Sequence, residues 1–334
     1  MRSGAPPELT ASAASAIDSS PFGKPCEVVL VDGEFLPAAD ARVSPYANVL
    51  SYGTGTFDGI RAFWNPDHED LYLLEADAHY DRMHRSARIL GLAMPYRTPD
   101  LVELTAELLR HNRVREDAYV RPVLFLAGEV LPVRMHDVST RLTVAVTPFP
   151  GDYASPHGVR CKVSTWRRAP DVTVPIRAKV IGSYIGPALA KTEAVRAGFD
   201  EALMLTLDGF VAEATTSNVF VRGGDAWATP PVTDDILPGI TRRQVMDLIC
   251  EYTGQSVSER RIHRSELFAC DEVLLCGTAT TVAGVVNVDG AEIGSGAVGE
   301  MTTRLHDDIR AIARRKSPRH SEWTTPVYGS GGAR

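Results

Sequence analysis

The sequence predicts a mixed α+β protein built from two domains, and three observations lead to this fold class. The chain has 334 residues, which is enough for two domains of ordinary size. Helix-like and strand-like hydrophobic patterns alternate in its first half. The second half is richer in strand patterns, which are interrupted by Asp-Gly and Gly-Gly pairs typical of turns between antiparallel strands. We therefore expect much antiparallel sheet.

The first domain is expected over residues 27–147. Residues 1–26 before it are rich in Ala, Ser and Pro and lack the basic start and apolar block of a signal peptide, so they predict a disordered lead. The domain should open with a hairpin in VVLVDGEFLP (28–37), with Asp32 and Gly33 in its turn.

Two helices and a strand should follow this hairpin. The first helix is expected over 76–90, with Gly91 as its stop. The second is expected to begin with Thr98 as its cap and Pro99 in the first helical position. The segment DAYVRPVLFLAG (117–128) predicts a strand because it is apolar and rich in β-branched and aromatic residues.

The second domain is expected over residues 158–316. A loop rich in Pro and Gly, TPFPGDYASPHG, predicts a connection between the domains at 148–157. EALMLTLDGFVAEA and VFVRGGDAWATP predict successive hairpins, and residues 317–334 predict a C-terminal tail. The helices of this domain are expected near 186–197, 241–253 and 296–315.

The composition argues against several classes of protein. A net charge of −7 and a pI near 5.7 come without any long basic stripe, which argues against a nucleic-acid-binding face. The pairs Arg167-Arg168 and Arg242-Arg243 are short, and we expect them at the solvated surface. No apolar run approaches the roughly 18 residues of a membrane span.

Cysteine and histidine usage indicate a reducing compartment and no metal site. The five cysteines are an odd number and form no CxxC pair, so a disulfide framework is not expected and a cytoplasmic location fits best. His79 and His84 are five residues apart, a spacing that does not place them on one helix face.

One lysine stands in an unusual place. Lys179 lies within the apolar run VPIRAKVIGSYIGPALA (174–190). Burial disfavours a charged ammonium, and a neutral amine can attack a carbonyl to form a Schiff base. A lysine whose charged end reaches the surface along the apolar run is the more common arrangement, so the catalytic interpretation needs support from other residues.

Two further segments could provide that support. Glu213 ends the strand GFVAE, where its carboxylate could pair with the protonated ring nitrogen of pyridoxal phosphate; a surface glutamate is the alternative. In LPGIT, Thr241 is expected to cap a helix whose free N–H groups could hold a phosphate. CGTATT (276–281) follows a strand and could supply more N–H and O–H donors.

The first half adds a candidate substrate pocket. The segment SYGTGTFDGIRAF combines Tyr52 and Phe57 with Arg61, but its glycine spacing is not that of a dinucleotide-binding loop. In YVR, Tyr119 and Arg121 alternate along a strand and therefore point to the same face. Arg121 could bind a carboxylate with two hydrogen bonds, or it could form a structural ion pair.

Taken together, these motifs resemble those of the class IV (fold type IV) pyridoxal phosphate aminotransferases, and most closely the branched-chain amino acid aminotransferases. The resemblance covers residues 27 to 325. It depends on seven motifs in the order of that family: YGTGTFDGIR, DRMHRSARI, AYVRP, AKVIGSY, EATTSNVF, LPGITR and CGTA. It implies a small α/β domain, a larger mixed-sheet domain shaped as a pseudo-barrel, and the cofactor at their junction.

The resemblance also implies roles for particular residues in holding pyridoxal phosphate (PLP). Lys179 would be the Schiff-base lysine, Tyr184 would bond the ring hydroxyl oxygen, and Glu213 would pair with the ring nitrogen. The remaining cofactor residues would bind the phosphate or pack beside the ring, and they are Arg82, Leu237, Ile240, Thr241 and Thr278.

The implied substrates are an amino acid and a 2-oxo acid. The main-chain N–H groups of Thr278 and Ala279 would receive the substrate carboxylate, and Arg121 would bind the distal carboxylate of 2-oxoglutarate. Tyr52 would reach across from a neighbouring subunit of a homodimer or a higher homo-oligomer. The rest of the substrate pocket would be Phe57, Gly59, Arg61, Tyr119 and Tyr153.

The expected reaction is a ping-pong transfer of the amino group from a hydrophobic or branched-chain L-amino acid to 2-oxoglutarate. Two departures from the family pattern keep alternatives open. Thr216-Ser217-Asn218 replaces the usual Gly-Glu-Asn, and Arg134 and His136 resemble a carboxylate-binding pair of D-amino-acid transaminases. A D-amino-acid or (R)-amine transaminase and an aminodeoxychorismate-lyase-like enzyme are therefore the alternatives. A specialised biosynthetic pathway would fit these departures.

Overall fold

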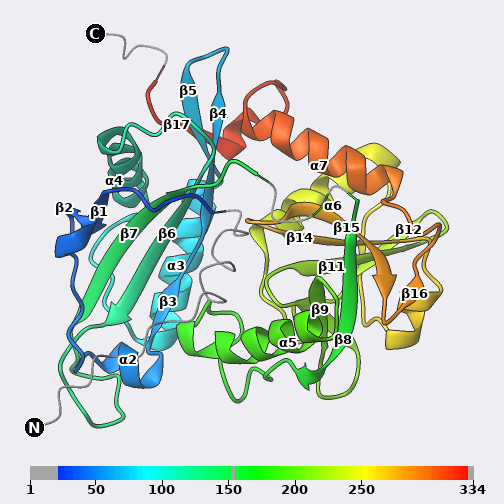
Figure 1. Cartoon of the computed structure of the whole chain (residues 1–334), viewed down its shortest axis with the longest axis horizontal. Coiled ribbons are helices and arrows are strands. Elements are labelled where there is room, and N and C mark those ends of the chain that lie inside the picture. Colours follow the sequence, from blue (N-terminus) through cyan, green and yellow to red (C-terminus); the bar gives the residue numbers. More distant parts are fainter. Residues whose placement is uncertain (1–21, 152–154, 156, 330–334) are drawn as a thin grey trace, which may run out of the picture.

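The computed structural model describes residues 22–151, 155 and 157–329, and within this range the strands form two sheets (Figure 1). The predicted lead lies outside the described residues up to position 21. Its last part is attached to the first sheet, since the N–H groups of Gly23 and Cys26 donate to the carbonyls of Pro148 and Val146. Part of the expected interdomain loop, at 152–154 and 156, also lies outside the described residues.

The first sheet is antiparallel throughout, in the order β17-β5-β4-β6-β7-β1-β2, and β3 pairs with β6. The predicted hairpin at 28–37 and the predicted strand at 117–128 are confirmed as β1–β2 and β6. The strands are β1 (Val28–Val31), β2 (Glu34–Pro37), β3 (Gly55–Phe57), β4 (Ile60–Asn65), β5 (Asp70–Leu74), β6 (Ala118–Leu126), β7 (Thr140–Pro148) and β17 (Thr324–Pro326).

Two predicted helices pack against this sheet, α3 (Ala76–Leu90) and α4 (Thr98–His111). The expected cap of α4 is wrong. The capping residue is Arg97, and Thr98 is already helical. The Thr98 hydroxyl instead donates to Asp81 of α3 at 2.6 Å. The sequence could not show this because the acceptor lies on another helix.

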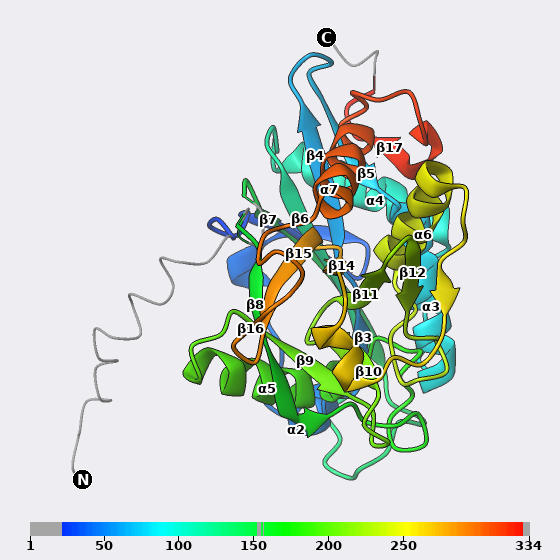
Figure 2. The same cartoon turned by 90° about the vertical axis from the view of Figure 1, so that its right-hand side faces the viewer.

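The segment after residue 316 returns to the first sheet. It was expected to be a tail, but β17 pairs with β5 in an antiparallel arrangement. The two strands lie side by side at the top of the molecule in both ribbon views (Figure 1, Figure 2). Because β17 is an edge strand of a sheet whose other strands come from residues 28–148, the C-terminal segment ties the two halves of the chain together.

The second sheet closes on itself, which confirms the expected mixed-sheet pseudo-barrel. The ring runs β10-β9-β8-β15-β14-β11 and returns to β10. β8 pairs in parallel with β9 and β15, and the other neighbours in the ring are antiparallel. Its strands are β8 (Val159–Arg167), β9 (Glu201–Leu205), β10 (Val211–Ala214), β11 (Asn218–Gly223), β14 (Glu272–Gly277) and β15 (Thr281–Val288). Three short strands extend from the ring, β12 (Ala226–Thr229), β13 (Ser258–Glu259) and β16 (Ala291–Glu292).

The three helices predicted for the second half are confirmed within a few residues, as α5 (Ile185–Arg196), α6 (Ile240–Thr253) and α7 (Glu300–Ala313). Thr241 is not the cap of α6, because the helix starts at Ile240 and Gly239 is the capping residue. The remaining short helices are α2 (Asn48–Tyr52), η1 (Ala38–Asp40), η2 (Ile181–Tyr184), η3 (Arg264–Phe268) and η4 (Ser321–Trp323).

One hydrophobic cluster joins the two sheets. It combines Phe63 and Leu74 of the first sheet with Phe220 of the barrel, Leu248 of α6 and Ile309 of α7. All five side chains are buried. The junction of the two sheets is therefore packed as a core, which gives a rigid support to any site built beside it.

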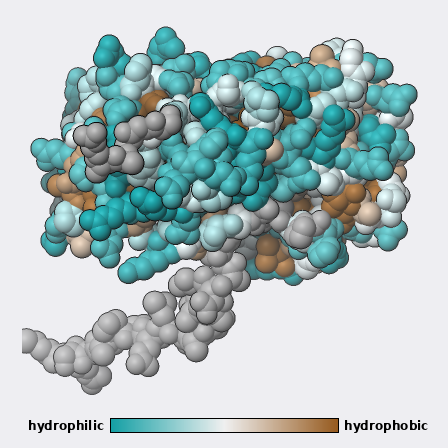
Figure 3. Space-filling view, turned by 90° about the horizontal axis from the view of Figure 1, so that it is seen from above, coloured by the Kyte–Doolittle hydropathy of each residue, from teal (hydrophilic) through white to brown (hydrophobic). Residues whose placement is uncertain are grey.

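The outer surface is largely hydrophilic on the face seen from above, with separate small hydrophobic areas (Figure 3). Of the helices that the structure describes, none has the length and apolar character needed to cross a membrane.

Candidate active site

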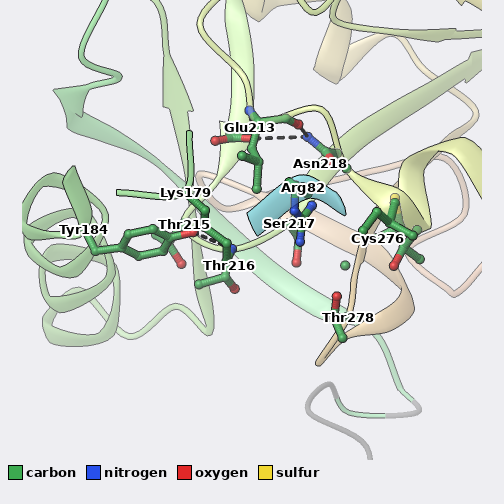
Figure 4. Close-up of a pocket in the computed structure, with 15 residues that line it drawn as sticks. Arg82, Lys179, Tyr184, Glu213, Thr215, Thr216, Ser217, Asn218, Cys276 and Thr278 are labelled. Carbon is green, nitrogen blue, oxygen red and sulfur yellow. Dashed lines mark hydrogen bonds between the residues drawn. The ribbon is translucent and has the colours of Figure 1, made fainter. Parts of the chain in front are cut away.

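A cavity lies where α3, the barrel turns and the start of α6 meet (Figure 4). All of the residues expected to hold a cofactor line it, although they come from distant parts of the chain. These residues are Arg82, Lys179, Tyr184, Glu213, Leu237, Ile240, Thr241 and Thr278. The residues predicted to hold the cofactor therefore lie around one cavity.

Lys179 is fixed both through its backbone and through its amine. The Thr56 hydroxyl and the Phe57 N–H donate to its carbonyl at 3.0 and 3.2 Å, and its N–H donates to Ser86 of α3 at 3.2 Å. Its Nζ donates to the Tyr184 hydroxyl oxygen at 2.7 Å (Figure 4). Because β3 and α3 hold the backbone, the side chain enters the cavity from a defined point.

Glu213 is a buried carboxylate with three donors around it. Arg168 lies 2.8 Å from Oε1, and the Asn218 amide and the Leu237 N–H donate to Oε2 at 3.0 and 3.1 Å. Burial raises the pKa of the Glu213 carboxyl, and the positive charge of Arg168 opposes that rise. The three donors fix the orientation of the Glu213 carboxyl group at this end of the cavity.

Arg168 is a site residue that the sequence analysis missed. It was expected at the solvated surface together with Arg167, but its side chain is buried and bound to Glu213. Arg242, from the second basic pair, is also buried and donates to Glu259 and to the carbonyl of Pro230. No local pattern marked Arg168, because it follows the last residue of β8, where the register is irregular and the three preceding residues are all exposed.

Arg82 is held by a second buried carboxylate, that of Asp58. The Nε and Nη2 atoms of Arg82 donate to the two oxygens of Asp58 at 2.9 and 2.7 Å, and His79 lies 2.8 Å from the same carboxylate. Burial alone would raise the pKa of Asp58, but Arg82 and His79 hold it below its ordinary value. Arg82 therefore enters the cavity as an oriented cation.

The start of α6 provides main-chain donors close to Arg82. No side chain caps this helix, and Gly239, Ile240 and Thr241 all line the cavity. The first N–H groups of a helix have no partner within the helix and favour anions. Gly239 is needed for close packing, because a Cβ at this position would lie 2.0 Å from the Asn218 amide oxygen.

These features fit pyridoxal phosphate. A cation, a helix start and the Thr278 hydroxyl could hold a phosphate, and Glu213 could face a protonated ring nitrogen. In Figure 4 the labelled side chains extend from Glu213 at one end of the view to Thr278 at the other, with Lys179 beside Tyr184.

Four residues expected in the substrate pocket are also brought together. The Arg121 guanidinium lies 4.7 Å from the ring centre of Phe57, and its Nη2 donates to the Tyr119 hydroxyl oxygen at 3.2 Å. A Cβ at Gly59 would lie 1.8 Å from that hydroxyl, so only glycine fits there. The predicted common face of Tyr119 and Arg121 is confirmed.

The other expected substrate residues are placed differently. Arg61 is buried, and its Nη1 donates to the Ala279 carbonyl at 3.5 Å. It therefore supports the backbone between β14 and β15. Tyr52 is partly exposed on α2, and its hydroxyl donates to the carbonyl of Leu131. The carbonyl of Arg134 accepts a 3.5 Å bond from Asn48 of the same region. Tyr153 lies outside the described residues.

Comparison with known proteins agrees with this geometry. The family model "Amino-transferase class IV" matches residues 55–288, and the chain belongs to this family. A probable branched-chain-amino-acid aminotransferase of Aquifex aeolicus is 40% identical over 297 residues, which cover 89% of this chain and 96% of the relative.

Solved structures are similar over the same range. The branched-chain aminotransferase of Thermoproteus uzoniensis with norvaline has a TM-score of 0.86 and 35% identity, covering 91% of this chain and all of that chain. The branched-chain amino acid aminotransferase of Escherichia coli has a TM-score of 0.85 and 30% identity, covering 90% of this chain and 99% of that chain.

Proposed function

We propose that this protein is a PLP-dependent aminotransferase that moves the amino group of a hydrophobic or branched-chain L-amino acid to 2-oxoglutarate. The observation that carries the proposal is the convergence of Lys179, Glu213 and Arg82 on one cavity at the junction of the sheets. When bound, pyridoxal phosphate supplies an aldehyde that forms a Schiff base with an amine and a ring that accepts electrons.

Each of the main residues of the cavity has a separate role in the reaction. Lys179 is the base and acid that moves the proton at the Cα of the amino acid, and Tyr184 holds its amine at 2.7 Å. Glu213 would pair with the ring nitrogen of the bound cofactor and favour its protonated form. Arg82 and the start of α6 would hold the phosphate of the bound cofactor, so that one lysine could reach the reacting atoms in both half-reactions.

A panel of amino donors tests the substrate class. Purified protein with pyridoxal phosphate is expected to convert L-leucine, L-isoleucine and L-valine with 2-oxoglutarate to glutamate and the corresponding 2-oxo acids, measured by chromatography. The D-enantiomers, pyruvate as acceptor, and pyruvate release from aminodeoxychorismate serve as comparisons. A preference for D-amino acids, or release of pyruvate, would replace the proposal with one of the alternatives.

Arg121 is proposed to bind the distal carboxylate of 2-oxoglutarate. Removing a charge-assisted contact of this kind costs about 1.5–3 kcal/mol, so Arg121→Ala should raise the KM for 2-oxoglutarate by about 10- to 100-fold. The KM for a monocarboxylic 2-oxo acid measured in the reverse reaction should change much less. Equal losses for both acids in steady-state assays would remove this role from Arg121.

We also propose that the chain works as a homodimer in the cytoplasm. The five cysteines are all free thiols, in keeping with a reducing compartment. Large apolar side chains are exposed on α2, just before it, and on the loop bound to it, and such a patch marks an interaction surface. They are Tyr46, Leu50, Tyr52, Leu131 and Val133. A monomeric mass by light scattering at assay concentration would contradict the dimer.

A further inference from the structure

The loop that joins β14 to β15 has an unusual backbone. It consists of residues 278–280, since Gly277 and Thr281 are paired across it. Thr281 has a φ of 55°, in the left-handed region, and is buried. Hairpin loops of three residues ordinarily place glycine at the left-handed position, and a β-branched residue there is strained. Strain of this kind persists only where the surroundings enforce it.

A pair of hydroxyl groups lies directly beside this strained position. The Oγ of Ser217 and the Oγ1 of Thr280 are 2.9 Å apart, and both residues are buried. Ser217 belongs to the turn between β10 and β11, so the bond links this turn to the loop. On the other side of the loop, the Ala279 carbonyl accepts the 3.5 Å bond from Arg61. The loop is therefore held from two directions.

The two turns are packed closely enough for this bond to set their relative position. A Cβ at Gly277 would lie 3.0 Å from the Thr216 carbonyl oxygen and 3.2 Å from the Ser217 hydroxyl. Ser217 and Thr278 both line the cofactor cavity. Ser217 and Thr280 also line a second cleft. The hydroxyl pair thus forms part of the wall between the two spaces.

We propose that Ser217 and Thr280 are positioning residues that hold loop 278–280 in the conformation that receives the α-carboxylate of the substrates. The inference depends on the proposed function and on the role that the family resemblance implies for the main-chain N–H groups of Thr278 and Ala279, which would bind that carboxylate. Ser217 belongs to the Thr216-Ser217-Asn218 segment that departs from the usual family pattern. Because amino donors and 2-oxo acids all carry this carboxylate, the pair acts on the affinity for both substrates.

The test uses the holoenzymes of Ser217→Ala and Thr280→Val, which each remove one hydroxyl. Loss of one hydrogen bond should raise the KM for L-leucine and for 2-oxoglutarate by about three- to tenfold while kcat changes less than about twofold. The dissociation constant of 4-methylvaleric acid, a monocarboxylate without an amino or keto group, should rise by the same factor. Titration against the cofactor absorbance measures it.

Three further variants sharpen the test. The double variant should be no worse than either single one, because both remove the same bond. Thr280→Ser retains the hydroxyl, so its KM values and its dissociation constant for 4-methylvaleric acid should stay close to those of the wild type. Thr192→Ala removes the hydroxyl of an exposed threonine on α5 that donates to the Ala188 carbonyl, and it should change none of these constants.

The inference would be overturned if the KM values and the dissociation constant of 4-methylvaleric acid were unchanged in both single variants. It would also be overturned if these constants rose by the same factor in Thr192→Ala. The use of two single variants keeps the test decisive if one of them fails to fold. A wild-type holoenzyme that binds 4-methylvaleric acid but transaminates no amino acid would contradict the proposed function alone. The ratio of binding constants between wild type and Ser217→Ala would still decide the inference, because it is measured without turnover.

Discussion

Lys179→Ala is expected to abolish turnover while leaving the fold intact. Removal of a general acid-base group alone costs about 10²- to 10⁴-fold in rate, and this lysine is also expected to hold the cofactor covalently. The backbone anchors of residue 179, from Thr56, Phe57 and Ser86, do not involve the side chain that is removed. Thermal unfolding should therefore remain close to that of the wild type.

Two measurements check this result. Absorbance spectroscopy should show that the Schiff-base band of the wild-type holoenzyme is absent from the variant, and steady-state assays should show no repeated turnover. Lys316→Ala is the matched control, because Lys316 is a surface lysine 3.6 Å from Asp67 and such exposed pairs contribute little. A variant that lacks Lys179 but still completes many turnovers would exclude the proposed role.

The sequence predicted much of this site because several of its requirements are local. A lysine in an apolar run, a glutamate at the end of a strand and a Pro-Gly pair before a helix each have a recognisable pattern, and the structure brings Lys179, Glu213 and Ile240 to one cavity. The helices and the barrel could be predicted for the same reason, since hydrophobic periodicity reports which face of an element is buried.

The supporting residues could not be predicted because their partners are distant in the sequence. Arg168 meets Glu213 from 45 positions away, and Asp58 meets Arg82 from 24 positions away. A charged residue in isolation predicts solvent exposure, since burial of an unpaired charge is costly. Only the fold shows that each of these charges has a buried partner of opposite sign, which removes most of that cost.

The two wrong predictions of helix caps also arise because a local sequence pattern does not show the contacts of a side chain in the fold. Thr98 and Thr241 both lie within two positions of a capping residue, where a threonine is itself a frequent cap. In the structure the capping residues are Arg97 and Gly239, one position earlier in the first case and two in the second. The absence of a side-chain cap on α6 has a functional consequence, because it leaves the main-chain donors at that helix start open toward the cavity.

Glu213→Gln is expected to lower kcat strongly while the cofactor still binds. Glutamine has the size of glutamate but no negative charge, so it cannot hold a proton on a facing ring nitrogen. Loss of an electrostatic contact of this kind at a developing charge costs about 10²- to 10³-fold in kcat. Arg82 and the start of α6 are unchanged, so equilibrium dialysis should still detect bound pyridoxal phosphate.

Stability must be separated from catalysis in this variant, because Arg168 loses a buried partner 2.8 Å away and an unpaired buried charge destabilises the fold. Glu272→Gln provides the control. Glu272 is also a buried carboxylate bound to an arginine, Arg222 at 3.1 Å, but it does not line the cofactor cavity. Both variants should unfold at lower temperature than the wild type, and only Glu213→Gln should lose kcat. Near-normal kcat in Glu213→Gln would refute the partnership with the ring nitrogen, whereas an equal loss of kcat in Glu272→Gln would attribute the effect to stability alone.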